Sequence, residues 1–300
     1  AALVMSGGVG RGGAARLAAR GALRMGAGLV TVGCPPSALM ENAIHLDAIM
    51  LRKVVDGDAL AAVLADDSRI DALCIGPGLG TGAREAGLVR AVLEARRACV
   101  LDADALTLIA QDKALRDLLH ENCILTPHGG EFSRLFPDIA ARLGAPKHPE
   151  ARQYADLAER GDGNTTYKED QMAAIEKPHA RPAHQQGPLY SKVDAVRDAA
   201  CDVGCTVLLK GPDTVIAEPS GRAVVCAAQY ERAAPWLATA GAGDVLAGFI
   251  AGLLARRLDV FGAAKLGAWL HQECALSFGP GLIAEDLPEE LPKVFRQFGV

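Results

Sequence analysis

Short runs of apolar residues alternate with longer stretches of helical periodicity over most of the chain. The short runs predict β-strands, and the stretches between them predict helices, among them Ala14–Met25, Ala83–Arg96 and Ser191–Val203. Such alternation is typical of an α/β fold in which helices cover both faces of a mostly parallel sheet. The predicted strands are Leu3–Met5, Leu29–Val32, Leu73–Ile75, Val100–Leu101, Cys123–Leu125 and Val207–Leu209.

Glycines and polar residues gather directly after these predicted strands. In parallel α/β sheets, ligands bind outside the carboxyl ends of the strands, so the residues that follow the strands should share one ligand-binding edge. These residues are Ser6–Gly13, Gly76–Gly80, Asp102 with Asp104, Thr126–Glu131, and Lys210–Thr214.

The segment Thr239–Asp244 is a glycine-rich turn that opens into the apolar helix predicted over 245–254. Gly241 and Gly243 permit positive φ angles, and the free N–H groups and dipole of the helix start attract an anion. A carboxylate at this place would repel a phosphate, so Asp244 is interpreted as a base that takes the proton from an attacking hydroxyl. The alternative is that Asp244 only caps the helix.

Each of the other polar residues at this edge has a structural alternative. Asp104 could cap the helix that follows Asp102, and His128 could either contact a substrate or satisfy its own loop. Lys210 could meet a nucleotide phosphate or be a solvated surface lysine. The run Gly8–Gly13 fits G-x-G-x-x-G, but no acidic residue ends the second predicted strand, so the dinucleotide fingerprint is incomplete. No P-loop motif occurs in the sequence.

Composition narrows the class of protein. The chain has 300 residues, half of them hydrophobic, and a net charge of −5 with dispersed Lys and Arg, which does not indicate binding to nucleic acid or to an anionic membrane. No apolar run is long enough to span a bilayer and no signal-type start is present, so a cytoplasmic protein is predicted. Most of the eight cysteines lie in apolar runs and should be buried thiols. Cys201 and Cys205 are spaced as a ligand pair, but nothing completes a zinc set, so no protein metal site is predicted.

The chain is predicted to be a single domain over residues 1–300 with a polar insertion at about 144–190. The insertion is rich in proline and poor in branched aliphatic residues, and a helix could form around Glu150–Arg160. The chain begins almost inside its first predicted strand, which suggests a piece of a longer polypeptide.

Five segments together resemble the ribokinase-like superfamily, and within it the ADP- or ATP-dependent NAD(P)H-hydrate dehydratases. The resemblance covers essentially the whole chain except 144–188, and it is the combination of segments that makes it specific. They are Gly76–Gly80, Leu101–Leu106 (LDADAL), Leu125–Leu135 (LTPHGGEFSRL), Lys210–Ile216 (KGPDTVI) and Trp236–Gly248 (WLATAGAGDVLAG).

The resemblance implies a ribokinase-like fold and a repair reaction. Such enzymes use a nucleotide to phosphorylate the C6 hydroxyl of hydrated NADH or NADPH, and elimination of phosphate regenerates the double bond. By this resemblance Asp244 is the base, Mg²⁺ accompanies ADP or ATP, and the remaining roles fall on three sets of residues. The anion hole would be formed by Gly241, Ala242 and Gly243. The nucleotide would be bound by Lys210, Gly211, Pro212, Asp213 and Thr214. The hydrated dinucleotide would be bound by Ala14, Gly80, His128, Glu131, Arg134 and Asp244.

Two other functions remain alternatives, and two associations are predicted. A kinase for a small molecule such as a vitamin precursor would use Asp244 identically, and a nucleotide-binding regulatory module without turnover is a third reading. The first glycine-rich loop departs from the family at Arg11 and Gly12, where Ser, Tyr and Thr are common before Gly-Ala. A homo-oligomer is expected, and an epimerase domain, if one is fused to this chain, would lie outside it.

Overall fold

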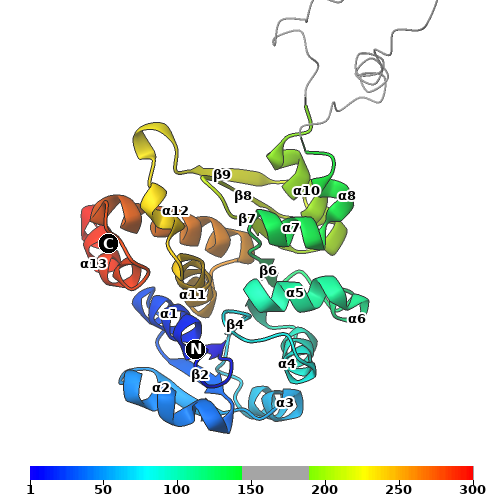
Figure 1. Cartoon of the computed structure of the whole chain (residues 1–300), viewed down its shortest axis with the longest axis vertical. Helices are drawn as coiled ribbons and strands as arrows, with labels where there is room; N and C mark the ends of the chain where they lie inside the picture. The colour runs from blue at the N-terminus through cyan, green and yellow to red at the C-terminus, as the bar shows by residue number, and fades with distance from the viewer. Residues whose placement is uncertain (144–188, 300) are drawn as a thin grey trace, which may run out of the picture.

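The computed structural model describes residues 1–143 and 189–299 and contains a nine-stranded sheet in the order β3-β2-β1-β4-β5-β6-β7-β8-β9 (Figure 1). The strands from β3 to β7 in this order are parallel, and β8 and β9 add an antiparallel hairpin at one edge. The strands are β1 (Ala2–Met5), β2 (Val30–Cys34), β3 (Met50–Lys53), β4 (Ala72–Ile75), β5 (Ala98–Leu101), β6 (Cys123–Leu125), β7 (Thr206–Leu209), β8 (Asp213–Ala217) and β9 (Ala223–Ala227).

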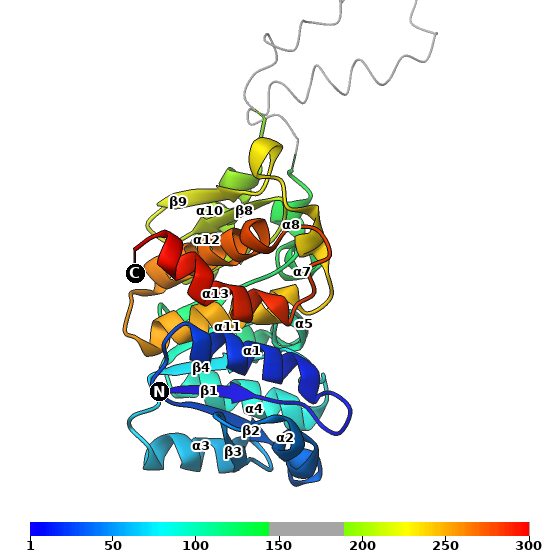
Figure 2. The ribbon, with the colours of Figure 1, turned by 90° about the vertical axis from the view of Figure 1, so that its left-hand side faces the viewer.

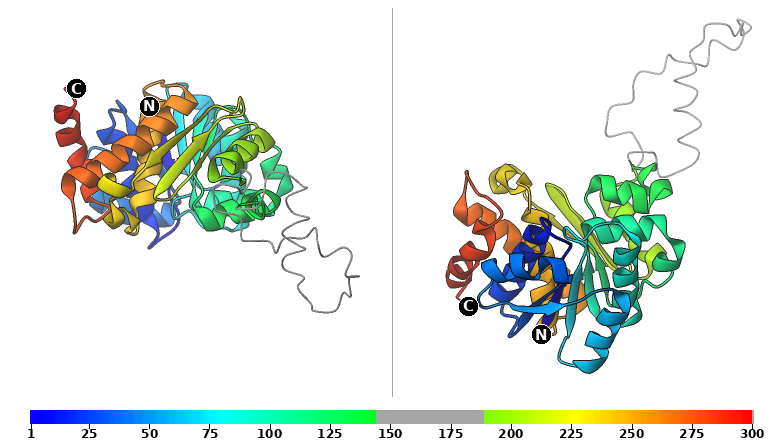
Figure 3. Two further views of the ribbon diagram at one scale, coloured as in Figure 1. Left: turned by 90° about the horizontal axis from the view of Figure 1, so that it is seen from above. Right: turned by 60° about the horizontal axis from the view of Figure 1, so that its bottom comes forward.

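Helices cover both faces of the sheet. Figure 2 shows α1, α11, α12 and α13 together in one layer, and Figure 3 shows the strands between the red and orange helices on one side and the green helices on the other. The first layer consists of α1 (Gly12–Arg24), α11 (Ala242–Ala255), α12 (Val260–Phe278) and α13 (Asp286–Gln297). The second contains α3 (Gly57–Asp66), α4 (Ala83–Glu94), α5 (Ala103–Gln111), α7 (Gly129–Leu135) and α10 (Lys192–Val203), and the shorter helices are α2 (Leu39–His45), α6 (Lys113–Arg116) and α8 (Pro137–Ala140).

Two hydrophobic cores lie on the two faces of the sheet, and successive strand residues alternate between them. In β1, Ala2 and Val4 belong to the core beneath α1 and α11, whereas Leu3 and Met5 belong to the opposite core. A strand buried on both faces reads as a continuous apolar run, which is why the short apolar runs predicted these strands well.

The predicted elements are found with small shifts at their ends, and the sequence analysis missed three strands. Edge strand β3 (sequence MLRK) is only partly buried, so it lacks the apolar signal of the central strands. The β8–β9 hairpin was also missed, and it places Asp213 and Thr214 at the start of a strand. Most of the predicted insertion, including the helix expected around 150–160, lies outside the described residues. Within residues 1–143 and 189–299, no helix has both the length and the apolar character needed to cross a bilayer.

Helices α1 and α11 approach so closely that glycine is required between them. A Cβ atom on Gly248 would lie 2.0 Å from the Ala18 carbonyl oxygen. We therefore expect Gly248→Ala to destabilise the protein by about 1–3 kcal/mol in urea unfolding, because the two helix backbones must separate, although Ala favours an isolated helix over Gly.

Gly87→Ala is the matched control, because Gly87 lies inside α4 and the nearest atom to its added Cβ is 4.0 Å away. This change should leave stability unchanged or raise it by up to about 1 kcal/mol. Equal effects of the two substitutions would show that helix contact does not explain the glycine in α11.

Candidate active site

The loops that follow the parallel strands start in hydrogen-bonded register along one edge of the sheet. The amide of Asp102 donates to the Ile75 carbonyl at 3.1 Å, and the amide of Thr126 donates to the Leu101 carbonyl at 3.1 Å. The amide of Lys210 continues the series by donating to the Pro127 carbonyl at 2.8 Å. The ends of β4, β5, β6 and β7 are thereby joined into one edge, as the sequence predicted.

The glycine-rich turn before α11 has the geometry of an anion-binding helix start. Gly241 is the N-cap residue in the left-handed region (φ 87°), and no side chain caps this helix. Asp244 is the third residue of α11, so the alternative that it caps the helix is wrong. The Ala242 amide donates to the Thr239 carbonyl at 3.3 Å, whereas the amides of Gly243 and Asp244 stand in the first turn, where a helix has no internal acceptor for them.

Asp244 in this turn interacts electrostatically with the carboxylates of Asp102 and Asp104 and with the ammonium group of Lys210. The carboxylate of Asp102 is buried and pairs with the Lys210 ammonium at 2.7 Å (Oδ1 to Nζ). The same ammonium lies 3.4 Å from the point where a Gly243 side chain would begin. Lys210 is therefore not a solvated surface lysine, since it bridges the end of β5 to the start of α11.

Burial and the neighbouring charges determine the pKa of Asp244. Its burial, and next the negative charge of Asp102, raise the pKa of Asp244 to about 6, while Lys210 opposes the shift and Asp104 adds to it. A carboxyl with a pKa near 6 is mostly ionised at neutral pH and still accepts a proton readily, as a general base requires.

Asp104 holds the neighbouring loop in place. Its Oδ2 accepts the amide hydrogen of Gly80 at 2.7 Å, and Asp102, not Asp104, is the N-cap residue of α5. The capping alternative for Asp104 is therefore wrong. Glycine is required at position 76, where this loop begins, because a Cβ on Gly76 would lie 1.7 Å from the Asp102 carbonyl oxygen.

The first glycine-rich loop lies against the same neighbours. Ala14, at the start of α1, has its Cβ 3.2 Å from the position of a Cβ on Gly78, so Ala14 packs against the 76–80 loop. The amide of Gly10 donates to Glu41 Oε2 at 2.7 Å, which ties the tip of the loop to α2.

The histidine turn serves partly as a helix cap. His128 Nδ1 accepts the amide of Glu131 at 3.4 Å, and Glu131 Oε2 accepts the amide of His128 at 2.8 Å, which together form a capping box for α7; Nδ1 also accepts the amide of Gly130 at 3.0 Å. Glu131 is buried, but the His128 side chain is 56% exposed. Because Nδ1 accepts, neutral His128 carries its hydrogen on Nε2, which lies 3.5 Å from Glu131 Oε1. Arg134 lies in the last turn of α7 and is exposed, and its Nη1 lies 3.8 Å from the point where a Gly130 side chain would begin.

The predicted nucleotide segment 210–214 turns from β7 into the β8 hairpin. Lys192 Nζ bonds to Asp213 Oδ1 at 2.7 Å, and Thr214 Oγ1 donates to the Gly211 carbonyl at 3.0 Å. The side chains of Asp213 and Thr214 therefore shape this turn, in which the Pro212 carbonyl also accepts the Ala228 amide at 2.6 Å.

His271, for which the sequence predicts no role, packs behind the 241–244 turn. Its Nε2 lies 2.8 Å from the Ala242 carbonyl oxygen, and burial lowers its pKa to about 4, so the neutral ring donates this hydrogen bond. His271 comes from the middle of α12, and no local motif marks it in the sequence.

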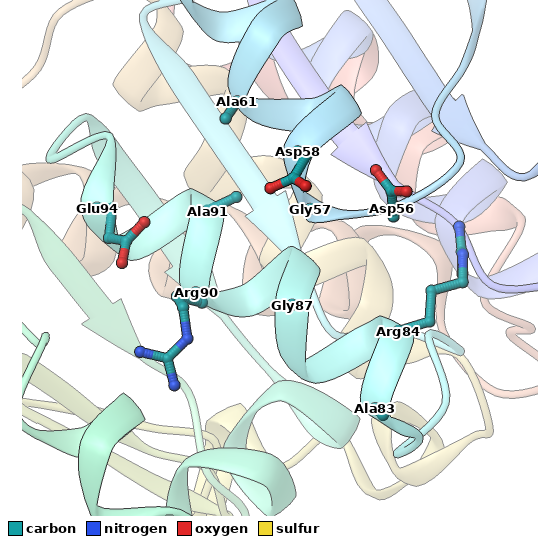
Figure 4. Close-up of a pocket in the computed structure, with 10 residues that line it drawn as sticks. All are labelled: Asp56, Gly57, Asp58, Ala61, Ala83, Arg84, Gly87, Arg90, Ala91 and Glu94. Carbon is teal, nitrogen blue, oxygen red and sulfur yellow. The ribbon is translucent and has the colours of Figure 1, made fainter.

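A separate cavity of about 300 Å³ lies between α3 and α4 (Figure 4). Its charged side chains are largely committed to local contacts, since Asp56 caps α3 and Arg84 binds the Val54 and Val55 carbonyls. None of Asp102, Lys210 and Asp244 lines it. The cavity is therefore distinct from the strand-end group.

The raised pKa of Asp244 predicts a pH-dependent cost in stability. A raised folded-state pKa means that this carboxyl favours folding only when protonated, so its contribution is full below pH 3.8 and is lost as the pH rises through about 6. We expect Asp244→Asn to be more stable than the unaltered protein at pH 8 by about 1–3 kcal/mol, given about 1.4 kcal/mol for each pKa unit. Urea unfolding at pH 8 and pH 4 measures this, and the gain should shrink towards zero at the lower pH. An equal free energy of unfolding for both proteins at pH 8 would contradict it.

Comparison with known proteins matches nearly the whole chain to one family. The profile described as NAD(P)H-hydrate dehydratase matches residues 2–185 and 177–293. The bifunctional NAD(P)H-hydrate repair enzyme Nnr of Coxiella burnetii is 33% identical over 290 residues, which cover 95% of this chain and 48% of that protein. The ADP-dependent (S)-NAD(P)H-hydrate dehydratase of Neisseria meningitidis is 32% identical over 276 residues, covering 91% of this chain and 75% of that protein. The chain spans about half the length of the bifunctional relatives.

A solved structure shares the fold. The ADP/ATP-dependent NAD(P)H-hydrate dehydratase of Bacillus subtilis, co-crystallized with ATP/Mg²⁺ and soaked with CoA, superposes with a TM-score of 0.67 at 24% identity, covering 99% of this chain and 91% of that one. The predicted ribokinase-like α/β fold with a mostly parallel sheet is confirmed.

Proposed function

From the membership of this chain in the NAD(P)H-hydrate dehydratase family, which the match over nearly all of its length establishes, we propose that it restores NADH or NADPH from their (6S)-hydrates with ADP or ATP as phosphoryl donor. One observation carries the proposal. A carboxylate with a pKa of about 6 stands at the open start of α11, beside the Asp102–Lys210 pair at the ends of the strands.

In the proposed first step, Asp244 takes the proton from the C6 hydroxyl of the hydrated ring. The hydroxyl oxygen then bonds to the terminal phosphorus of the nucleotide, and the bond to the departing AMP or ADP breaks. The first-turn amides of Gly243 and Asp244 and the α11 dipole would stabilise the charge on the transferred group. Lys210 would offset the added negative charge.

In the proposed second step, phosphate is a far better leaving group than hydroxide. The C6–O bond breaks with electron donation from the ring nitrogen, the neighbouring carbon loses a proton, and the ring double bond returns. The products are NADH or NADPH, inorganic phosphate, and AMP from ADP or ADP from ATP. His128 and the 76–80 loop, with Ala14 and Gly80, would hold the nicotinamide side of the substrate, while Glu131 fixes the turn that presents His128.

Mg²⁺ fits this site as a companion of the nucleotide. Asp102, Asp104 and Asp244 offer the oxygen donors that Mg²⁺ prefers. These three carboxylates are not grouped closely enough to hold an ion by themselves. Among the described residues, the group that is close enough consists of Cys99, His120 and Cys123, whose sulfur and nitrogen ligands do not suit Mg²⁺. A Mg²⁺ ion would therefore be held mainly by nucleotide phosphates, and it would neutralise charge during transfer.

A turnover assay tests the proposed function. The protein is incubated with hydrated NADH, Mg²⁺ and either ADP or ATP, and the return of reduced-nicotinamide absorbance is followed together with phosphate release. We expect one phosphate for each NADH formed. Parallel reactions with vitamin-precursor alcohols and ATP examine the kinase alternative, and phosphorylation of an alcohol without repair of the hydrate would replace our proposal by it. Nucleotide binding with no turnover on any substrate would favour the regulatory module.

The rate should depend on the ionisation of Asp244. Since its pKa is about 6, we expect kcat/KM to be level from pH 7 to 8.5 and to fall about tenfold for each unit below pH 6. Initial rates across this range measure the profile. A level profile down to pH 5 would exclude Asp244 as the base.

A homo-oligomer, a cytoplasmic location and a fused epimerase domain remain predictions from the sequence. The names of two relatives, which call them bifunctional, also support a second fused domain.

A further inference from the structure

A row of cysteines crosses the sheet at the edge opposite the strand-end group. Cys99 in β5 is the direct register partner of Cys123 in β6. The β6–β7 pairing begins one position further along, at Ile124 and Thr206, which sets Cys205 beside Cys123. All three cysteines are fully buried in the same core.

A histidine completes this group. A ring nitrogen of His120 and the sulfurs of Cys99 and Cys123 all lie within 4.8 Å of one another. His120 is 3% exposed. Its Nδ1 accepts the Asn122 amide at 3.3 Å, whereas its Nε2 has no hydrogen-bond partner among the described residues. An unpaired buried nitrogen costs about 1–3 kcal/mol, so its retention needs an explanation.

The spacing of the sulfurs suits a shared metal ion better than a disulfide. The Sγ atoms of Cys99 and Cys123 are 3.5 Å apart. Two Zn–S bonds of about 2.3 Å at a tetrahedral angle place their sulfurs about 3.8 Å apart. Neighbouring strands lie about 4.8 Å apart, which is wider than the 3.5–4.5 Å between Cβ atoms that a disulfide prefers.

We propose that Cys99, His120 and Cys123 bind a thiophilic d¹⁰ cation such as Zn²⁺, with a water molecule as the fourth ligand of the tetrahedron. Binding deprotonates the Cys99 and Cys123 thiols, releases two protons and forms two metal–sulfur bonds, so the charges of the ion and the two thiolates cancel inside the core. The ion would join β5 and β6 at their amino ends. Ligation through Nε2 would give that nitrogen a partner and move the ring hydrogen to Nδ1, which would then no longer accept the Asn122 amide.

Metal uptake by the full chain tests the site, in a Cys201→Ser background because Cys201 is exposed. Metal-free protein is dialysed under reducing conditions against Zn²⁺ and analysed for metal, and a second sample is titrated with Co²⁺. We expect one tightly held Zn²⁺ per chain, and a cobalt spectrum with thiolate charge-transfer bands and the d–d bands of tetrahedral geometry. Failure to retain zinc, or a cobalt spectrum without thiolate bands, would overturn the proposal.

Substitutions then locate the ligands. Cys123→Ser and His120→Ala should each lower the retained zinc at least tenfold, while Cys274→Ser, at a buried thiol in α12 on the other face of the sheet, should leave it at one per chain. Circular dichroism and nucleotide binding check that each variant is folded. If either ligand variant does not fold, the cobalt spectrum of the parent protein still decides the question. Unchanged zinc in folded Cys123→Ser or His120→Ala would also refute the site.

Discussion

The Asp244→Asn variant is expected to fold and to bind nucleotide normally while its turnover of hydrated NADH falls about 10²- to 10⁴-fold, the range for loss of a general base. The amide keeps the shape of the carboxyl but cannot take the hydroxyl proton. No side chain caps α11, so the substitution removes no cap. The measurement is kcat from the return of reduced-nicotinamide absorbance, with nucleotide affinity determined separately by calorimetry.

Asp286→Asn is the matched control for this variant. Asp286 also lies in the first turn of a helix, α13, where its Oδ2 accepts the Ile283 amide at 2.9 Å. Its replacement should leave kcat within about twofold of the unaltered protein. If Asp244→Asn retained near-normal turnover, another group would have to be the base. If it lost nucleotide affinity together with turnover, Asp244 would be a binding residue.

The sequence predicted those parts of the fold and site that have a local signature. A strand buried on both faces is visible as an apolar run. The six residues of the 239–244 turn, two of which are glycine, indicate an anion-binding helix start. Side chains that interact but lie far apart in the sequence have no such local pattern. The Asp102–Lys210 pair joins residues 108 positions apart, and it forms only because β5 and β7 end at the same edge.

Register explains why the cysteine group and the support from His271 were missed. Cys99 and Cys123 lack a recognisable ligand spacing along the chain, and they meet because β5 and β6 pair residue for residue. His271 lies on the buried face of α12, and only the packing of α12 against α11 brings it to Ala242. Hydrophobic patterns predict that a residue is buried, but they do not predict which buried groups meet.

The last and broadest prediction concerns the buried ion pair. Lys210→Met should destabilise the protein by about 3–5 kcal/mol in urea, because it leaves the Asp102 carboxylate buried without its counter-ion. Turnover should fall as well, by about 10²- to 10³-fold if Lys210 stabilises the transferred phosphoryl group. The pKa of Asp244 should rise further above 6, because Lys210 now lowers it, and the acid limb of the rate profile should move to higher pH.

Asp102→Asn combined with Lys210→Met separates the structural role from the catalytic one. The double variant contains no unpaired buried charge, so most of the lost stability should return, while turnover should stay low because the positive charge beside Gly243 is still missing. Asp102→Asn alone keeps that charge and removes a like charge near Asp244, so its acid limb should move to lower pH. Urea unfolding and kcat for all four proteins complete the cycle. If turnover returned together with stability in the double variant, the function of Lys210 would be only to neutralise Asp102, and the phosphoryl group would have to be stabilised by the start of α11 alone.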